Sequence, residues 1–364
     1  MARTITLLFA GVVLFVTTAF GQPVVAFDAS KLVKLGDEVK YGSYLVRKIG
    51  DGAYQINDPG DKSTKGGGWG VDMYLVSGTR KAMLFDLGNN YIAGYEKDAL
   101  KPRRNAAEEL RAVVDGLTGR LPLEIAITHM HPDHDGMAGA FAGGKVPMWA
   151  GEGEDLNALK IQHNLDPSMF RTFKQGSTSF DLGGGHVVET FHVRGHSNGG
   201  TVYLLKKDSL VFSGDALGSG FGQAFGTVER LKQVAEDSQN LVNYIKANYA
   251  PYERYLLRVY TGHSWQNTYG GFLHPNKASI DVGYLDWRFI QDVSACANGI
   301  LQGKWLVEGT GIKHMGNMLY TDAWGSAAGR AIMVSGIGTI ILPLDLAYQA
   351  AGLAVPPELQ RNSP

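Results

Sequence analysis

The segment from His129 to Asp135, with the sequence HMHPDHD, concentrates side chains that bind metal ions. It follows directly on the apolar run 123–128, LEIAIT, which predicts a buried β-strand. Imidazoles and carboxylates gathered at the end of a buried strand would compete for partners and be partly desolvated if no metal were bound. The segment therefore predicts a metal site rather than a solvated polar loop.

The order of these side chains favours two metals over one. Neighbouring residues of a strand face opposite sides, so His129 and His131 share a face while the strand continues. Pro132 ends the hydrogen-bonded ladder, and the turn that follows can bring Asp133 and His134 beside the two histidines. Together these groups would already fill one tetrahedral zinc and leave no open position for chemistry. The simplest interpretation is one metal at the first two histidines and a second at the Asp-His pair.

The rest of the chain alternates between predicted strands and helices. Strands are predicted over 44–49, 53–58, 71–78, 81–88, 123–128, 186–193, 201–207, 209–215 and 255–262. Helices are predicted over 105–117, 136–142 (with Asp135 as its N-cap), 227–248, 278–301 and 323–352. The strands come both in meanders and in βα units, which predicts an α/β fold of mixed sheets with helices outside.

Composition excludes several functional classes. The 364 residues carry a formal net charge of −1, so there is no electrostatic footprint for nucleic acid or for an acidic membrane surface. Cys296 is the only cysteine, which excludes an intrachain disulfide and multi-thiolate zinc sites. Histidine and carboxylate side chains are therefore the expected metal ligands, and a small molecule is the expected substrate.

The N-terminal residues have the pattern of a secretory signal peptide. Arg3 precedes an apolar stretch at 5–19. The small residues Ala19 and Gly21 then stand just before Gln22. The stretch is short for a membrane span, which needs about 20 residues. We expect residues 1–21 to be removed on export to a bacterial periplasm or the extracellular space, with no stable membrane insertion afterwards.

The segment THMHPDHDG resembles the H-x-H-x-D-H signature of the metallo-β-lactamase fold superfamily. The resemblance continues in order over about residues 43–263, through Asp86 in LFDLG, His196 in VRGHSNGG, Asp215 in LVFSGDAL and His263 in VYTGHSW. The superfamily implies an αβ/βα four-layer sandwich with its site along one edge of two facing sheets. The residues agree with this, because each candidate ligand follows a predicted strand, where a rigid scaffold presents reactive groups.

The resemblance also implies a ligand set and a mechanism. The first metal takes His129, His131 and His196, and the second takes Asp133, His134 and His263, with Asp215 bridging the two. Two Zn²⁺ ions per chain are expected, with iron or manganese as alternative metals. They would share a water, lower its pKa to form a bridging hydroxide, and polarise the substrate oxygen.

Two carboxylates have further expected roles at this site. Asp133 is expected to orient the hydroxide and to pass a proton to the leaving group. Asp86 is expected to support the site from behind the ligands.

Trp69 lies in a glycine-rich segment, STKGGGWG, just before a predicted strand. One interpretation is a flap that closes this ring over an apolar substrate. The other is a tryptophan that covers the edge of the core.

Asp215 bears on the branch of the superfamily. True β-lactamases of this family carry Cys or Ser near this point, so Asp215 favours the branch of glyoxalase II, lactonases and phosphodiesterases. Gly218 stands where the lactonases carry a tyrosine, and the C-terminus shows no clear basic glutathione-binding pattern. The expected substrate is a small ester, lactone or amide-like carbonyl compound. The alternatives are phosphodiester or sulfate-ester hydrolysis and an iron-dependent persulfide dioxygenase.

We divide the chain into the signal peptide at 1–21, a metallo-β-lactamase fold domain at 22–263, and a C-terminal extension at 264–364. The extension contains no landmark of the family and is expected to be mostly helical and packed on the same domain. We assign it to substrate enclosure or to dimerisation, the second of which would make the protein a homo-oligomer.

Overall fold

The computed structural model describes residues 24–58, 70–92, 101–102, 105–119, 121–142, 146–219, 223–224, 226–267, 283–304, 306–307, 311–312, 318–320, 330–335 and 337–357. The predicted signal peptide at 1–21 and Trp69 lie outside these residues. In the described part of the chain, no helix combines the length and the apolar character needed to cross a bilayer.

An eight-stranded sheet comes first along the chain, in the order β1-β2-β3-β4-β5-β8-β9-β10. Its strands are β1 (Glu38–Tyr41), β2 (Tyr44–Gly50), β3 (Ala53–Asp58), β4 (Val71–Ser77), β5 (Ala82–Phe85), β8 (Leu123–Ala126), β9 (Met148–Gly151) and β10 (Phe170–Phe173). β1 to β5 form an antiparallel meander, whereas β5, β8, β9 and β10 run parallel. The predicted hairpin of 44–49 and 53–58 is confirmed as β2 and β3.

A six-stranded sheet faces the first, in the order β11-β12-β13-β14-β16-β17. Its strands are β11 (Ser179–Gly183), β12 (His186–His192), β13 (Thr201–Leu205), β14 (Leu210–Gly214), β16 (Arg258–Thr261) and β17 (Leu285–Asp286). β14 and β16 run parallel, so their carboxyl ends meet at the same edge of the sheet.

The period-2 pattern of β4 shows how the first sheet separates two apolar cores. Met73 and Leu75 pack in the outer core together with residues of helix α1 (Ala106–Thr118). Tyr74 and Val76 point the other way, into the core between the two sheets. Because all four side chains are buried, residues 73–76 of β4 form a continuous apolar run rather than an alternating one.

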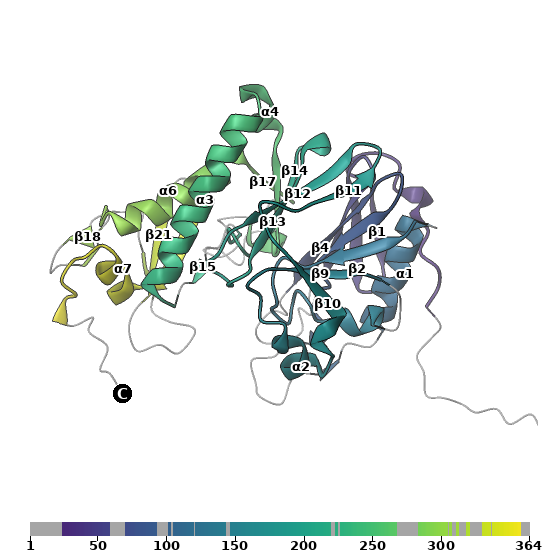
Figure 1. The fold of residues 1–364 in the computed structure, drawn as a ribbon, viewed down its shortest axis with the longest axis horizontal. Helices are drawn as coiled ribbons and strands as arrows, with labels where there is room; N and C mark the ends of the chain where they lie inside the picture. Colours follow the sequence, from purple (N-terminus) through teal and green to yellow (C-terminus); the bar gives the residue numbers. More distant parts are fainter. Residues whose placement is uncertain are drawn as a thin grey trace, which may run out of the picture.

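The second sheet separates cores in the same way. Tyr203 of β13 lies between the sheets, whereas Val202 packs outward against a core that includes helices α3 (Val228–Asn248) and α6 (Trp287–Leu301). The layers therefore run helix, sheet, sheet, helix, with α1 on one side and α3 and α6 on the other (Figure 1). The predicted αβ/βα four-layer sandwich is confirmed.

The longest helix begins and ends where the sequence predicts. Thr227 caps α3, because its hydroxyl oxygen accepts the N–H of Arg230 (3.2 Å). The remaining helices are α2 (Asn157–His163), α4 (Pro251–Leu256) and α7 (Leu344–Ala350), with 3₁₀ turns η1 (Ala29–Lys31), η2 (Ala138–Phe141), η3 (Pro167–Met169), η4 (Lys206–Asp208) and η5 (Ser264–Gln266). The short strands β6 (Tyr91–Ile92) and β7 (Lys101–Pro102) pair with each other.

The C-terminal residues form both helices and a small sheet. The sheet has the order β15-β22-β21-β20, with β15 (Gln223–Ala224), β20 (Met318–Tyr320), β21 (Arg330–Ser335) and β22 (Gly338–Pro343), and β18 (Leu306–Val307) pairs with β19 (Gly311–Ile312). Helices are present in the C-terminal part: α6 falls within the predicted helix at 278–301 but begins only at Trp287, and α7 covers only 344–350 of the predicted helix at 323–352. Both pack in the same core as α3. The boundary between 263 and 264 stays a prediction.

Several predicted elements differ from the structure in extent or type, and three of them show the physical reasons. Within the predicted helix at 323–352, residues 330–335 and 338–343 pair as antiparallel strands, because the run GTIILP is rich in β-branched residues, and of the described residues only 344–350 are helical. The predicted strand at 255–262 begins only at Arg258, since Pro251 starts helix α4 before it.

The third is the predicted helix at 136–142, which is only the 3₁₀ turn η2. Gly136 and Gly139 disfavour a longer helix here. Asp135 is not its N-cap; the Asp135 carboxylate instead contacts His163 Nε2 at 2.7 Å, from the end of α2.

Candidate metal centre

The loop after β8 turns back on itself just as the sequence predicts. The carbonyl oxygen of His131 accepts the N–H groups of His134 (2.8 Å) and Asp135 (3.0 Å), which closes a turn around Pro132. The His134 carbonyl in turn accepts the N–H of Leu87, in the loop after β5 (2.6 Å). These bonds fix the histidines and the aspartate of the motif around one point at the sheet edge.

The other candidate ligands arrive from the second sheet. His196 lies in the loop between β12 and β13, Asp215 follows β14, and His263 follows β16. The N–H of Gly262 donates to the carbonyl of Gly214 (2.9 Å), so the parallel pairing continues up to the last two candidates. The structure thus brings the seven predicted metal-site residues together from four loops.

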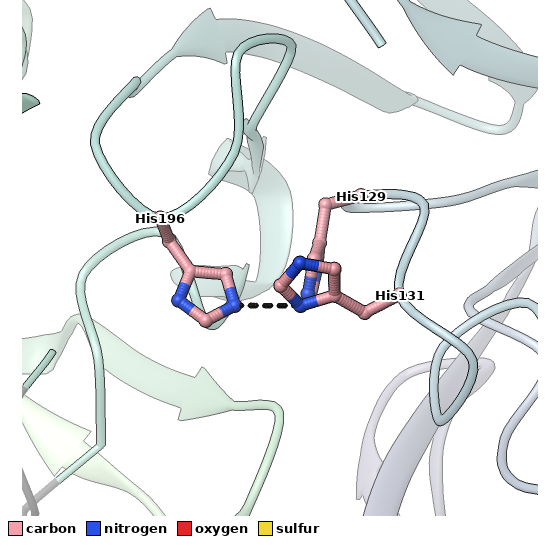
Figure 2. Close-up of side chains that lie close together, drawn as sticks. All are labelled: His129, His131 and His196. Carbon is pink, nitrogen blue, oxygen red and sulfur yellow. Dashed lines mark hydrogen bonds between the residues drawn. The ribbon is translucent and has the colours of Figure 1, made fainter. Parts of the chain in front are cut away.

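Three histidines form what we call the first ligand group: His129, His131 and His196. Figure 2 shows their rings converging, with His196 reaching from the loop opposite the other two. His196 Nε2 lies 2.9 Å from His131 Nδ1, and the rings of His129 and His196 have centroids 4.7 Å apart.

Burial keeps the first ligand group in its neutral form. It lowers the pKa of each of its imidazoles, to about 4 for His196. A metal binds the unprotonated form of an imidazole, so the environment favours the state that a ligand requires.

Asp133, His134 and His263 form the second ligand group. Asp133 Oδ2 lies 3.4 Å from His263 Nε2 and 3.8 Å from His134 Nε2. Burial alone would lower the pKa of both histidines, but the surrounding carboxylates outweigh it, raising the pKa of His263 to about 10 and that of His134 well above its usual value. The second ligand group therefore lies in the more negative electrostatic environment of the two.

Asp215 lies between the two ligand groups. Its Oδ2 atom is 3.6 Å from His196 Nε2, 3.7 Å from His134 Nε2 and 3.3 Å from His263 Nε2. Asp215 also forms a third candidate cluster with His129 and His134. A single carboxylate is thus within reach of side chains from both groups.

The donor atoms fit divalent cations. Within the described part of the chain, the buried Nε2 atoms of His129 and His134 have no partner at hydrogen-bond distance. Leaving a buried polar atom without a partner is costly, and a bound cation would remove that cost. A set of imidazoles and carboxylates of this kind suits Zn²⁺ and related transition metals.

Groups behind the ligands determine which ring nitrogen faces the centre. Asp86 Oδ2 lies 2.9 Å from His134 Nδ1, and the carbonyl of Gly70 lies 2.6 Å from His263 Nδ1. With the proton on Nδ1, each ring donates to these oxygens and presents Nε2 as a lone pair. Asp86 therefore lies behind His134, in a position to support it.

Two supporting residues were not predicted from the sequence. The Thr128 hydroxyl donates to Asp86 Oδ2 (2.9 Å) and lies 3.1 Å from His129 Nδ1. Asp72 is buried on β4 and accepts the N–H of Ser264 (2.6 Å), the residue after His263. Thr128 could have been noticed because it directly precedes the motif, whereas Asp72 gave no local signal.

Residues 66–263 match the family model described as the metallo-beta-lactamase superfamily. This match ends at His263, the last of the candidate ligands. A comparison with curated proteins found no match.

Solved structures of metallo-beta-lactamases resemble this chain in fold. One from Erythrobacter litoralis, with beta-mercaptoethanol in its active site, is 15% identical at a TM-score of 0.46 and covers 72% of this chain and 99% of that one. One from Pontibacter korlensis is 17% identical at 0.48, covering 70% and 99%. DIM-1 metallo-beta-lactamase exposed to ceftazidime is 14% identical at 0.48, covering 71% and 99%.

Proposed function

Because the chain belongs to the metallo-beta-lactamase superfamily, whose members are generally metal-dependent hydrolases, we propose that it is a dinuclear zinc hydrolase. Its proposed substrate is a small ester, lactone or amide-like carbonyl compound. The observation that supports this most is the pair of adjoining ligand groups with Asp215 Oδ2 within 3.7 Å of both.

Each proposed ion has its own protein ligands. The first ligand group would hold one cation, the second ligand group the other, and Asp215 would contact both. Two cations held there would supply Lewis acidity towards the substrate oxygen and lower the pKa of a water molecule towards neutrality.

Asp133 is the residue we assign to proton transfer. Its side chain is 21% exposed, whereas those of His134 and His263 are almost fully buried, so it is the member of the second ligand group open to a substrate. Although burial would raise its pKa, His134 and His263 lower the pKa of Asp133 below the usual range. An ionised carboxylate can accept a proton from water and donate it to a leaving group.

Asp215 favours assigning the protein to the branch of the superfamily that contains glyoxalase II, lactonases and phosphodiesterases. A carboxylate at this position can neutralise part of the charge of two neighbouring cations through two oxygen atoms, whereas a serine carries no charge and a cysteine thiolate has a single donor atom. This is why we favour an ester or lactone over a β-lactam as the substrate.

We further propose that the protein acts after export. The basic Arg3, the apolar stretch 5–19 and the small residues at 19 and 21 support a cleaved signal peptide. N-terminal sequencing of the protein recovered from a secreting bacterial host tests this. A start at Gln22 is expected, and a start at Met1 would contradict export with cleavage.

Metal analysis combined with a substrate screen tests the proposed activity. Purified protein should contain two zinc ions per chain and hydrolyse chromogenic carboxylate esters or lactones faster than phosphate or sulfate esters. A preference for phosphate or sulfate esters would move the assignment to those substrates. One iron per chain with oxygen consumption on a persulfide would replace hydrolysis by dioxygenation.

A further inference from the structure

Glu154 lies between the two loops that carry the first ligand group, although it is not itself one of the clustered ligands. Its Oε2 atom accepts the N–H of Met130 (3.1 Å), the residue between His129 and His131. Its Oε1 atom accepts the hydroxyl of Ser197 (2.5 Å), the residue directly after His196. One side chain is therefore bonded next to all three histidines of the group.

A third hydrogen bond and close backbone packing hold Glu154 in this position. The N–H of Gly199 also donates to Glu154 Oε1 (3.0 Å). A Cβ atom on Gly199 would lie 2.5 Å from Glu154 N and 2.6 Å from its Cγ, so the contact requires glycine there. The Gln175 side chain ties the loop that carries Glu154 to the His196 loop, because it donates to the carbonyls of Glu152 (3.2 Å) and Gly199 (2.9 Å).

We propose that Glu154 is a positioning residue for the first metal: it clamps the His129–His131 loop to the His196 loop, so that three imidazoles from two sheets converge on one point. This inference rests on the proposed function, since it concerns the metal assigned to the first ligand group. The three histidines come from loops 65 residues apart, and their rings meet where the two loops converge.

The chemistry of a carboxylate suits this role better than that of an amide. Both carboxylate oxygens are acceptors, and the three groups that face them are all donors. A glutamine would place its NH₂ group against one of these donors, either the Met130 N–H or the Ser197 and Gly199 pair. One of the two loops would then lose its hydrogen bond to the side chain at position 154, although that side chain would keep nearly the same shape.

The test compares Glu154→Gln with Glu152→Gln, an exposed glutamate of the same loop. Metal-free full-length proteins are equilibrated with zinc at graded free concentrations, and bound zinc per chain is measured. We expect Glu154→Gln to weaken one of the two zinc ions by about 10- to 100-fold, the usual effect of a residue behind a ligand. The other ion should bind as in wild type, and Glu152→Gln should match wild type throughout.

A second pair of variants assigns the weakened ion. In a His263→Ala background the second ligand group has lost a member, so the remaining tight zinc is expected at the first. Adding Glu154→Gln should weaken that zinc, and adding Glu152→Gln should not. Amide hydrogen exchange on the metal-free proteins gives an independent readout: the Met130 or the Gly199 N–H should exchange faster in Glu154→Gln than in wild type, and neither should do so in Glu152→Gln.

Each failure has its own signature. Zinc binding in Glu154→Gln equal to that in Glu152→Gln would overturn the positioning role. Equal weakening of both ions would also overturn it, because it would indicate general destabilisation. If neither wild type nor the variants bind zinc, the proposed function fails as well. This outcome is distinguishable from loss of the positioning role alone, because there wild type still binds zinc.

Discussion

Asp86 shows how a single residue is held in a costly conformation to support the centre. Its φ of 63° lies in the left-handed region, which Gly adopts routinely but Asp only occasionally. The conformation persists because its carboxylate accepts the N–H of Thr128 (2.6 Å) and lies against His134 Nδ1 (2.9 Å). Backbone strain of this kind is concentrated at functional sites, where surrounding bonds over-determine it.

Replacing Asp133 with alanine should abolish turnover while leaving the fold intact. The change removes both a ligand of the second group and the proposed proton carrier, and loss of proton transfer alone lowers rates by about 10²- to 10⁴-fold. Turnover and thermal unfolding of zinc-loaded Asp133→Ala should be measured beside Asp115→Ala, which alters a carboxylate 58% exposed on α1. Turnover of Asp133→Ala close to that of the control would rule out the assignment.

Replacing Asp215 with asparagine should lower the occupancy of the second metal more than that of the first. The neutral amide cannot offset the repulsion between two cations. The second ligand group would then have Asp133 as its one remaining carboxylate, whereas the first ligand group would keep all three of its imidazoles. Metal content per chain and kcat should be measured together, and kcat should fall sharply.

Two histidine variants make the Asp215 result specific. His263→Ala should show the same selective loss of the second metal, whereas His196→Ala should deplete the first. If Asp215→Asn keeps two metals and a normal rate, Asp215 does not bridge, and the argument against a β-lactamase is lost with it.

At the level of secondary structure, β14 and β16 present their ligands because they are parallel neighbours that end together. Gly214 is the last residue of β14 and Gly262 directly follows β16, and the N–H of Gly262 donates to the Gly214 carbonyl (2.9 Å). A Cβ atom on Gly262 would collide with Asp215 Oδ1 and would lie 2.7 Å from His134 Cε1. The absence of a side chain at Gly262 is therefore a requirement of the centre.

Gly262→Ala should displace Asp215 and His134 and reduce zinc content below two per chain. A displacement of reacting groups of about 1 Å lowers kcat by about 100-fold. Gly226→Ala is the matched control, because a Cβ atom there meets nothing within 4 Å. Unchanged zinc content and rate in Gly262→Ala would show that the strand end tolerates a side chain and that the close approach is not needed.

At the scale of the whole molecule, the candidate centre joins the two sheets at one edge. His129 to His134 follow a strand of the eight-stranded sheet, whereas Asp215 and His263 follow strands of the six-stranded sheet. Tyr74 of the first sheet also donates its hydroxyl to the Thr261 carbonyl of the second (2.5 Å). Bound cations would therefore link layers that otherwise meet through apolar packing and a few hydrogen bonds.

Removal of metal should inactivate the protein and lower its thermal stability. A ligand that binds only the folded state raises the free energy of unfolding by about 2.7 kcal/mol at a concentration 100 times its Kd. Prolonged chelation followed by removal of the chelator should lower Tm and abolish turnover, and zinc or manganese should restore both. Activity and Tm that are indifferent to prolonged chelation would contradict a metal-dependent hydrolase.

The errors of prediction lie mainly in the C-terminal part and at element ends. The sequence predicts a helix over the apolar run 338–343, but this run pairs with 330–335 as a strand. It also packs in one core with α6, which lies far from it in the sequence. Short apolar runs fit a helix and a strand equally well, so only the neighbouring segment decides between them. The long, strongly periodic α3 carried enough local information to be predicted closely.

The sequence by itself indicated the superfamily, because strand ends, a proline turn and histidine spacing are local features, and the layer order and the ligand set followed from that resemblance. Only the tertiary structure decided what supports them. Glu154 bonds Met130 across 24 residues, and Asp72 bonds Ser264 across 192. A buried donor must find an acceptor, but which acceptor it finds depends on the segments that the fold packs against it.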